Sequence, residues 1–248
     1  MNQWITGKII NIKKWNQNLF SIIIKAPINS FSAGQFAKLS VINDNKKIQR
    51  AYSYVNAPNN SNLEFYINLI PNGKFTNHLY QLKINQNIMI NKHSFGFFTI
   101  DEIQNCEILW MMATGTGIGP YLSILQEGKW INKFNKIVLI YSVRLKKDLN
   151  YLDLIYKLKK QYKNKIIFVS IVTREQSIKS LKNRIPILIK NNTLEKKIKL
   201  NIDPKTSHVM LCGNPDMVKE TQKVLQNLKN MQKNLRKSPG HITTENYW

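Results

Sequence analysis

One stretch of the sequence, residues 108–120, reads Ile-Leu-Trp-Met-Met-Ala-Thr-Gly-Thr-Gly-Ile-Gly-Pro. The apolar run at its start predicts a strand that is buried on both faces of a sheet. The glycines permit a tight turn and a close approach of the backbone to a phosphate or ribose, and Pro120 suits the first turn of a helix. Their spacing is G-x-G-x-G rather than G-x-G-x-x-G, and the stretch lacks the Gly-Lys-Ser/Thr of a P-loop. The stretch therefore predicts the strand, glycine turn and helix of a nucleotide-binding α/β domain.

The rest of the second half continues this pattern of alternating strands and helices. Further strands are predicted over 136–142, 165–172 and 207–212, and helices over 148–162 and 215–228. Such alternation predicts a parallel sheet that is covered on both faces. Ligands of these sheets bind at the carboxyl ends of the strands.

The first half of the chain has a different pattern, of short strands separated by turn residues. Six strands at this spacing predict a small antiparallel barrel. A glycine turn at Pro71-Asn72-Gly73 precedes a short predicted helix over 74–79, whose N-terminus can bind an anion. The pattern changes near Asp101, so we predict one domain over 1–101 and a second over 102–248. The predicted strands are 4–14, 18–26, 35–42, 48–56, 63–70 and 87–91.

Composition restricts the class of protein further. A fraction of 43% apolar residues suffices for real cores, and no apolar run approaches the length of a membrane span. The N-terminus lacks the features of a signal peptide, and Cys106 and Cys212 form no C-x-x-C motif, so a reducing cytoplasm is the expected location. No partner at metal-ligand spacing accompanies the histidines, and we expect no metal site.

The net charge of +23 suits either nucleic acid or an acidic protein partner. Because lysine is abundant along the whole chain, and no basic block or zinc-finger spacing is present, we consider nucleic acid the less favoured partner.

A second informative stretch is Arg50-Ala-Tyr-Ser53. Arginine offers a planar fork for phosphate, tyrosine a flat ring and a hydroxyl, and serine a small hydroxyl. Together these side chains could hold a flat, phosphorylated cofactor. Taken alone, the stretch is better interpreted as an ordinary strand with one wet face.

Arg-Ala-Tyr-Ser resembles the flavin-binding Arg-x-Tyr-Ser of the ferredoxin–NADP reductase family. Residues 2–56, 63–80, 106–127 and 206–248 resemble, in order, the bacterial flavodoxin/ferredoxin–NADP reductases. The resemblance implies a β plus α/β fold: an N-terminal antiparallel Greek-key β-barrel that binds FAD, and a C-terminal, parallel-sheet, Rossmann-like domain that binds NADP. It also implies a monomer that transfers hydride between NADPH and FAD, and single electrons between FAD and a small acidic flavodoxin or ferredoxin.

The resemblance further implies which residues contact FAD. Lys74, Phe75 and Thr76 would act through backbone atoms on the pyrophosphate, Thr116 would lie beside the flavin and the entering nicotinamide, and the terminal aromatic residue would lie against FAD. The expected FAD contacts are Arg50, Ala51, Tyr52, Ser53, Tyr66, Ile67, Asn68, Lys74, Phe75, Thr76, Thr116 and Trp248.

Three arginines are expected to follow strands of the second domain, at the edge where a nucleotide binds. An NAD-preferring domain would tend to carry an acidic residue near the position of Arg144, whereas arginine suits the 2′-phosphate of NADP. The Cys-Gly-Asn-Pro-Asp-Met run at 212–217 matches a family motif around the nicotinamide. The expected NADP contacts are Val143, Arg144, Thr173, Arg174, Arg184, Asn214, Pro215 and Asp216.

The residues expected at the reacting centre are Ser53, Cys212 and Glu245. Ser53 would hydrogen-bond near the flavin N5, and Cys212 would pack beside the nicotinamide C4 rather than act as a nucleophile. Glu245 matches a family carboxylate near the active site. Two other hypotheses stay open: a reductase component of an oxygenase, for which two cysteines are too few to hold an iron–sulfur cluster, and a basic nucleic-acid-binding protein.

Overall fold

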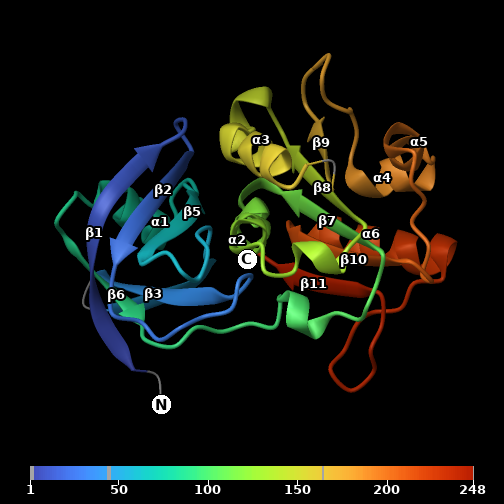
Figure 1. The fold of residues 1–248 in the computed structure, drawn as a ribbon. Coiled ribbons are helices and arrows are strands. Elements are labelled where there is room, and N and C mark those ends of the chain that lie inside the picture. The colour runs from blue at the N-terminus through green and yellow to red at the C-terminus, as the bar shows by residue number, and fades with distance from the viewer. Residues whose placement is uncertain (1–2, 44–45, 164, 248) are drawn as a thin grey trace. The chain divides into compact units, whose positions relative to one another are not determined.

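Six antiparallel strands build the first half of the chain in the computed structural model, which describes residues 3–43, 46–163 and 165–247 (Figure 1). They form one sheet in the order β4-β3-β6-β1-β2-β5, in which β6 lies between β3 and β1. Tyr54, just past β4, bridges Phe65 of β5, so the two edge strands meet and the sheet curls on itself. This confirms the predicted antiparallel barrel. The strands are β1 (Trp4–Lys14), β2 (Leu19–Lys25), β3 (Phe36–Asn43), β4 (Lys46–Ser53), β5 (Asn62–Asn68) and β6 (Asn87–Asn91).

The inward-facing residues of these strands explain why they close over a core. Phe20, Ile22 and Ile24 alternate along β2 and are fully buried, as the two-residue period of a strand requires. Helix α1 (Lys74–Gln81) covers this core with Phe75 and Leu79.

The chain divides into two units, which we describe separately. Met1–Thr99 and Gly119–Glu127 form the barrel unit, and Ile100–Ile118 and Gly128–Trp248 form the parallel-sheet unit. Helix α2 (Gly119–Glu127) belongs to the barrel unit. The Ser123 Oγ donates to the Asn56 carbonyl oxygen at 2.7 Å, and the Gln126 Nε2 donates to that of Val55 at 2.7 Å. These two bonds fix the segment that follows Ser53.

Five parallel strands form the sheet of the parallel-sheet unit, in the order β11-β10-β7-β8-β9. Every residue of β10 is buried, as are the five inner residues of β7, which agrees with the predicted strands covered on both faces. The strands are β7 (Ile108–Thr114), β8 (Lys136–Val143), β9 (Ile166–Val172), β10 (Ser207–Gly213) and β11 (Ile242–Asn246). The α-helices are α3 (Leu152–Gln161), α4 (Ile185–Lys190), α5 (Thr193–Ile198) and α6 (Pro215–Lys229), and the 3₁₀ turns are η1 (Ile100–Glu102), η2 (Gly115–Ile118), η3 (Ile131–Lys133) and η4 (Lys146–Asp148).

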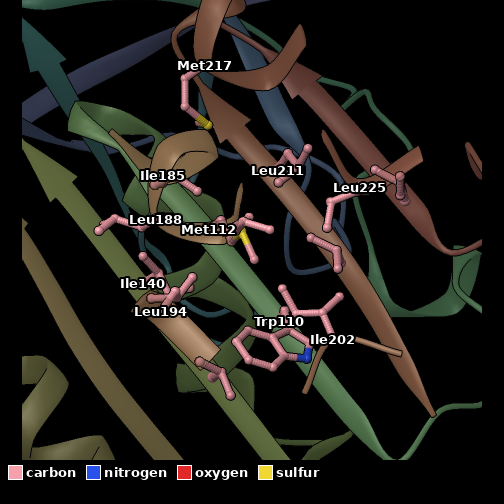
Figure 2. Close-up of a cluster of buried hydrophobic side chains, with 14 of the residues drawn as sticks. Trp110, Met112, Ile140, Ile185, Leu188, Leu194, Ile202, Leu211, Met217 and Leu225 are labelled. Carbon is pink, nitrogen blue, oxygen red and sulfur yellow. The ribbon is translucent and has the colours of Figure 1, made fainter. Parts of the chain in front are cut away.

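One face of this sheet packs against α4, α5 and α6. Trp110 and Met112 from β7 lie among side chains from the three helices, including Leu188, Leu194 and Leu225, as Figure 2 shows. A partly buried ion pair joins α5 to α6: the Lys229 Nζ lies 2.8 Å from a carboxylate oxygen of the buried Glu195. In the described part of the chain, no helix combines the length and apolar character needed to cross a membrane.

Several predicted boundaries in this unit are wrong. The helix predicted to begin at 148 begins at Leu152, because Tyr151 adopts a left-handed φ of 62° that ends the preceding turn. Helices α4 and α5 and strand β11 were not predicted. Arg184 was expected at a strand end but lies at the N-cap of α4, well after β9.

Candidate functional site

In the barrel unit, the predicted Arg50–Ser53 stretch forms the last four residues of β4. Arg50 and Ala51 are exposed, Tyr52 is half-buried and Ser53 is buried. The Tyr52 ring stacks on the Phe75 ring of α1, with 5.9 Å between centroids and 21° between planes. Burial raises the pKa of the Tyr52 hydroxyl, and the positive charge of Arg50 opposes that shift, so the phenol stays neutral. An aromatic ring, a cation and a small hydroxyl therefore lie together at this end of the strand.

The neighbouring strand β5 contributes Tyr66, Ile67 and Asn68. The Tyr66 ring meets the Trp15 ring edge-to-face at 6.3 Å between centroids, and Ile67 is fully buried in the barrel core. Because the Ile67 side chain is committed to the core, only its backbone is available to a ligand.

The N-terminus of α1 lies close to this strand end, since Phe75 stacks on Tyr52. Gly73 occupies its N-cap, where a side chain would come within 2.9 Å of the Thr76 Oγ1 and 3.0 Å of the Ile70 carbonyl oxygen. The first turn comprises Lys74, Phe75 and Thr76, and the backbone N–H groups of a first helical turn attract anions. This turn suits the binding of a phosphate group.

In the parallel-sheet unit, the strand order reverses between β7 and β10, and such a switch point is where open α/β sheets bind ligands. Two glycines at this edge leave no room for a side chain. Gly213 has a φ of 128°, and a Cβ on it would lie 2.2 Å from the Thr114 Oγ1. A Cβ on Gly117 would lie 2.7 Å from the Cys212 carbonyl oxygen. The Thr114 Oγ1 accepts a hydrogen bond from the Asn214 N–H at 2.8 Å, which joins the ends of the two strands. Only glycine fits these two close approaches.

Cys212 and Glu245 are neighbours at this edge, because they are paired in the register of β10 and β11. The Cys212 Sγ lies 3.9 Å from the Glu245 Oε2 and is fully buried. Burial and the Glu245 charge both raise the pKa of the Cys212 thiol well above its ordinary value, against a smaller effect of a hydrogen bond from Tyr247. The thiol is therefore neutral, as expected of a packing group and not of a nucleophile.

Arg144 and Arg174 come side by side because the ladder between β8 and β9 continues past the strand ends. The Val143 carbonyl oxygen accepts from the Thr173 N–H at 3.0 Å, and the Arg144 carbonyl oxygen accepts from the Arg174 N–H at 2.9 Å. Both arginine side chains are exposed. Two guanidinium groups thus extend from adjacent positions at one edge of the sheet.

The remaining predicted residues are distributed among three other places. The Asn214 side chain caps α6 by accepting from the N–H groups of Asp216 and Met217, and Pro215 is the first residue of that helix. Arg184 lies 3.6 Å from Glu220 in an exposed ion pair. Thr116 is buried in η2 of the parallel-sheet unit, and Trp248 lies outside the described residues.

Two residues that contact the segment of residues 212–214 were missed by the sequence reasoning. Thr114, which joins β7 to β10, could have been noticed as the hydroxyl residue that precedes the glycine turn. Tyr247 influences Cys212, and its backbone N–H donates to the Gly213 carbonyl oxygen at 2.9 Å. No local sequence signal marks that second contact, because it depends on the pairing of β11.

Two domain families match this chain, in the order that the two units suggest. The model of the family "Oxidoreductase FAD-binding domain" matches residues 9–98, and that of "Oxidoreductase NAD-binding domain" matches residues 111–223. A curled antiparallel barrel followed by a parallel five-stranded sheet, with these two matches, defines a flavin- and nicotinamide-dependent oxidoreductase.

Full-length similarities narrow the class. The "Flavodoxin/ferredoxin--NADP reductase" of Buchnera aphidicola subsp. Baizongia pistaciae is 58% identical over 249 residues, and that of Escherichia coli K12 is 47% identical over 248, with both chains covered completely in each case. A Neisseria gonorrhoeae ferredoxin NADP+ reductase, solved with bound FAD and NADP, has a TM-score of 0.94 at 30% identity, with 100% of each chain covered. The chain belongs to the flavodoxin/ferredoxin–NADP reductase family.

Proposed function

We propose that this chain is an NADPH-dependent flavodoxin/ferredoxin reductase that uses FAD. Bound FAD supplies the chemistry that side chains lack, since it accepts a hydride and releases electrons one at a time. The protein supplies binding, orientation and electrostatics. One observation carries the nucleotide part of the proposal: Arg144, and not an acidic residue, directly follows β8, and it stands beside Arg174, which comes just after β9.

The end of β4 and the first turn of α1 suit FAD. In this proposal the guanidinium of Arg50 pairs with the cofactor phosphates, Tyr52 stacks on the flavin ring and Ser53 hydrogen-bonds near N5. The backbone of Lys74, Phe75 and Thr76 holds the pyrophosphate. Gly73 supports this assignment, because a side chain there would crowd the turn.

The carboxyl edge of the parallel sheet suits NADP. Arg144, Arg174 and Arg184 bind the 2′-phosphate side of the nucleotide, with Val143 and Thr173 as backbone neighbours. Asn214, Pro215 and Asp216 flank the nicotinamide side, and Thr116 lies close to it in this assignment. Cys212 packs as a neutral thiol, and Glu245 accepts its hydrogen bond. Trp248 is assigned to FAD by family resemblance alone.

The proposed electron partner is a small acidic flavodoxin or ferredoxin. Both relatives carry these carriers in their names, and a net charge of +23 would steer an acidic protein toward this chain. The proposed location is the cytoplasm, where Cys106 and Cys212, both free thiols here, would stay reduced.

The test is NADPH oxidation with flavodoxin as electron acceptor, measured at increasing salt concentrations. We expect the rate with flavodoxin to fall steeply with salt, because screening weakens steering of an acidic partner. A small neutral quinone serves as control, and its rate should change little. A failure to reduce flavodoxin or ferredoxin at low salt, while the quinone is reduced, would contradict the proposed partner.

A further inference from the structure

The loops after β8 and β9 are joined by one side chain as well as by the backbone. The Lys146 N–H donates a hydrogen bond to the Glu175 Oε1. Glu175 directly follows Arg174, and Lys146 lies two residues after Arg144. This contact therefore extends the ladder in which the Arg174 N–H donates to the Arg144 carbonyl oxygen.

A second carboxylate holds the same loop from its other side. The Asp148 Oδ2 accepts from the Leu145 N–H at 3.3 Å, and the Asp148 N–H donates to the Leu145 carbonyl oxygen at 2.9 Å. Two consecutive N–H groups, those of Leu145 and Lys146, are thus held by carboxylates. Asp148 belongs to the loop itself, whereas the Glu175 side chain joins the loop to the end of the neighbouring strand, next to the backbone bond between Arg174 and Arg144.

These residues also line an open hollow of about 600 Å³, formed by Leu145, Lys146, Lys147 and Glu175. Glu175 is half-buried in it, while Lys146 and Lys147 are exposed. The hollow adjoins the chain positions of Arg144 and Arg174. The Glu175 carboxylate would repel a doubly charged phosphate bound at Arg144 and Arg174. A favourable contribution of Glu175 to that site would offset this repulsion.

We propose that Glu175 is a positioning residue for the 2′-phosphate site and thereby contributes to the preference for NADPH. This inference rests on the proposed function, in which Arg144 and Arg174 bind that phosphate. By accepting the Lys146 N–H, Glu175 holds the loop of residues 144–148 against the end of β9. The hydrogen bond keeps Arg144 beside Arg174, and it also engages a carboxylate that would otherwise suit the ribose 2′-hydroxyl of NADH.

The two roles of the side chain, acceptor and charge, are separable by substitution. Glu175→Gln keeps an oxygen that can accept the Lys146 N–H and removes the negative charge. Glu175→Ala removes both. Asp153→Asn is the matched control, because it removes an exposed carboxylate of the same unit at the start of α3.

The experiment is calorimetric titration of the FAD-loaded enzyme with adenosine 2′,5′-bisphosphate and with 5′-AMP. We expect Glu175→Ala to bind the bisphosphate about fivefold more weakly than the parent, as the loss of one ordinary hydrogen bond predicts, with 5′-AMP binding unchanged. Glu175→Gln should bind the bisphosphate at least as tightly as the parent, and Asp153→Asn should match it. In steady-state kinetics, Glu175→Ala should raise the KM for NADPH without lowering kcat.

The opposite results are equally specific. Tighter binding by both Glu175 variants would show that the residue acts only as a repelling charge and would overturn the inference. Parental binding by Glu175→Ala would overturn it as well. The Arg144→Ala variant distinguishes these outcomes from a failure of the proposed function. If the parent does not bind the bisphosphate more tightly than 5′-AMP, and Arg144→Ala does not weaken bisphosphate binding, the 2′-phosphate assignment itself is wrong.

Discussion

The backbone N–H of Arg174 donates to the carbonyl oxygen of Arg144 at 2.9 Å, just beyond the ends of β9 and β8. The bond places two cations at adjacent positions of a parallel sheet. Like charges at adjacent positions disfavour each other unless an anion lies between or above them. A phosphate that is present in NADPH and absent from NADH is the anion that the proposed function supplies.

Replacing Arg144 and Arg174 by alanine should therefore raise the KM for NADPH far more than the KM for NADH. Each lost charge-assisted contact should cost about 1.5–3 kcal/mol, or about 10- to 150-fold in kcat/KM for NADPH. Arg236→Ala is the control, since Arg236 pairs with Glu102 at 3.5 Å and is outside the proposed contacts. Equal losses with both nucleotides would contradict the 2′-phosphate assignment.

Arg50→Ala should weaken FAD retention by the barrel unit. Loss of a charge-assisted contact with a phosphate predicts an FAD Kd that is about 10- to 150-fold higher, measured from the fluorescence of flavin released on dilution. Lys47→Ala is the matched control, because alternation places Lys47 on the opposite face of β4. If the two variants release FAD equally, removal of charge alone explains the loss, and Arg50 has no specific role.

The two thiols should react slowly in the native protein. Burial raises the pKa of Cys106 to about 11, and burial followed by the Glu245 charge raises that of Cys212 well above its ordinary value. With a pKa near 11, only about one thiol in a thousand is ionised at pH 8, so labelling by a thiol reagent should be hundreds of times slower than in guanidinium chloride. A Cys106→Ser variant isolates Cys212. Rapid stoichiometric labelling of Cys212 in that variant would contradict its assignment as a neutral packing group.

His208 should make the protein sensitive to acid. Its ring nitrogen Nε2 lies 2.9 Å from the Thr243 Oγ1, and burial, with smaller effects of the His241 and Lys133 charges, lowers the pKa of His208 to about 3. The unfolded chain takes up a proton as the pH falls through about 6.5, whereas the folded chain does not until about pH 3, so stability is lost as the pH falls between these values. This group alone should lower the free energy of unfolding by about 2 kcal/mol between pH 7 and pH 5.

Urea denaturation at pH 7 and pH 5 measures this effect. His208→Gln should lose about 2 kcal/mol less than the parent over that range, because glutamine does not titrate. The control is His78→Gln, on the partly exposed side of α1, which should keep the acid sensitivity of the parent. An unchanged pH dependence in His208→Gln would show that other groups cause the acid sensitivity.

Local patterns were sufficient to predict most of the fold. The six barrel strands follow from apolar alternation and from asparagine turns; for example, the Asn16 side chain accepts from the N–H groups of Asn18 and Leu19. The apolar run at Ile108–Ala113 and the glycines after it correctly predicted β7, the turn that follows it and helix α2, since these features are encoded within one short stretch. The family resemblance added the Greek-key and Rossmann-like descriptions of the two domains, the cofactors and the class of enzyme.

The elements that were missed depend on contacts between distant residues. Strand β11, Ile-Thr-Thr-Glu-Asn, has no apolar alternation and is a strand because it pairs with β10. Helices α4 and α5 have six residues each and are separated by Asn192 with a φ of 59°, so neither gives a clear helical period. The contact between Glu175 and Lys146 likewise joins two loops that are far apart in the sequence, and no local sequence pattern predicts it.

The most direct test is a visible absorption spectrum of the purified protein, before and after anaerobic addition of NADPH or NADH. We expect a yellow protein whose flavin absorption bleaches rapidly with NADPH and much more slowly with NADH. A colourless protein that does not take up FAD on incubation would contradict the FAD site assigned to Arg50–Ser53 and the proposed reductase function that depends on it. Equal bleaching rates with the two nucleotides would contradict the assignment of Arg144 and Arg174.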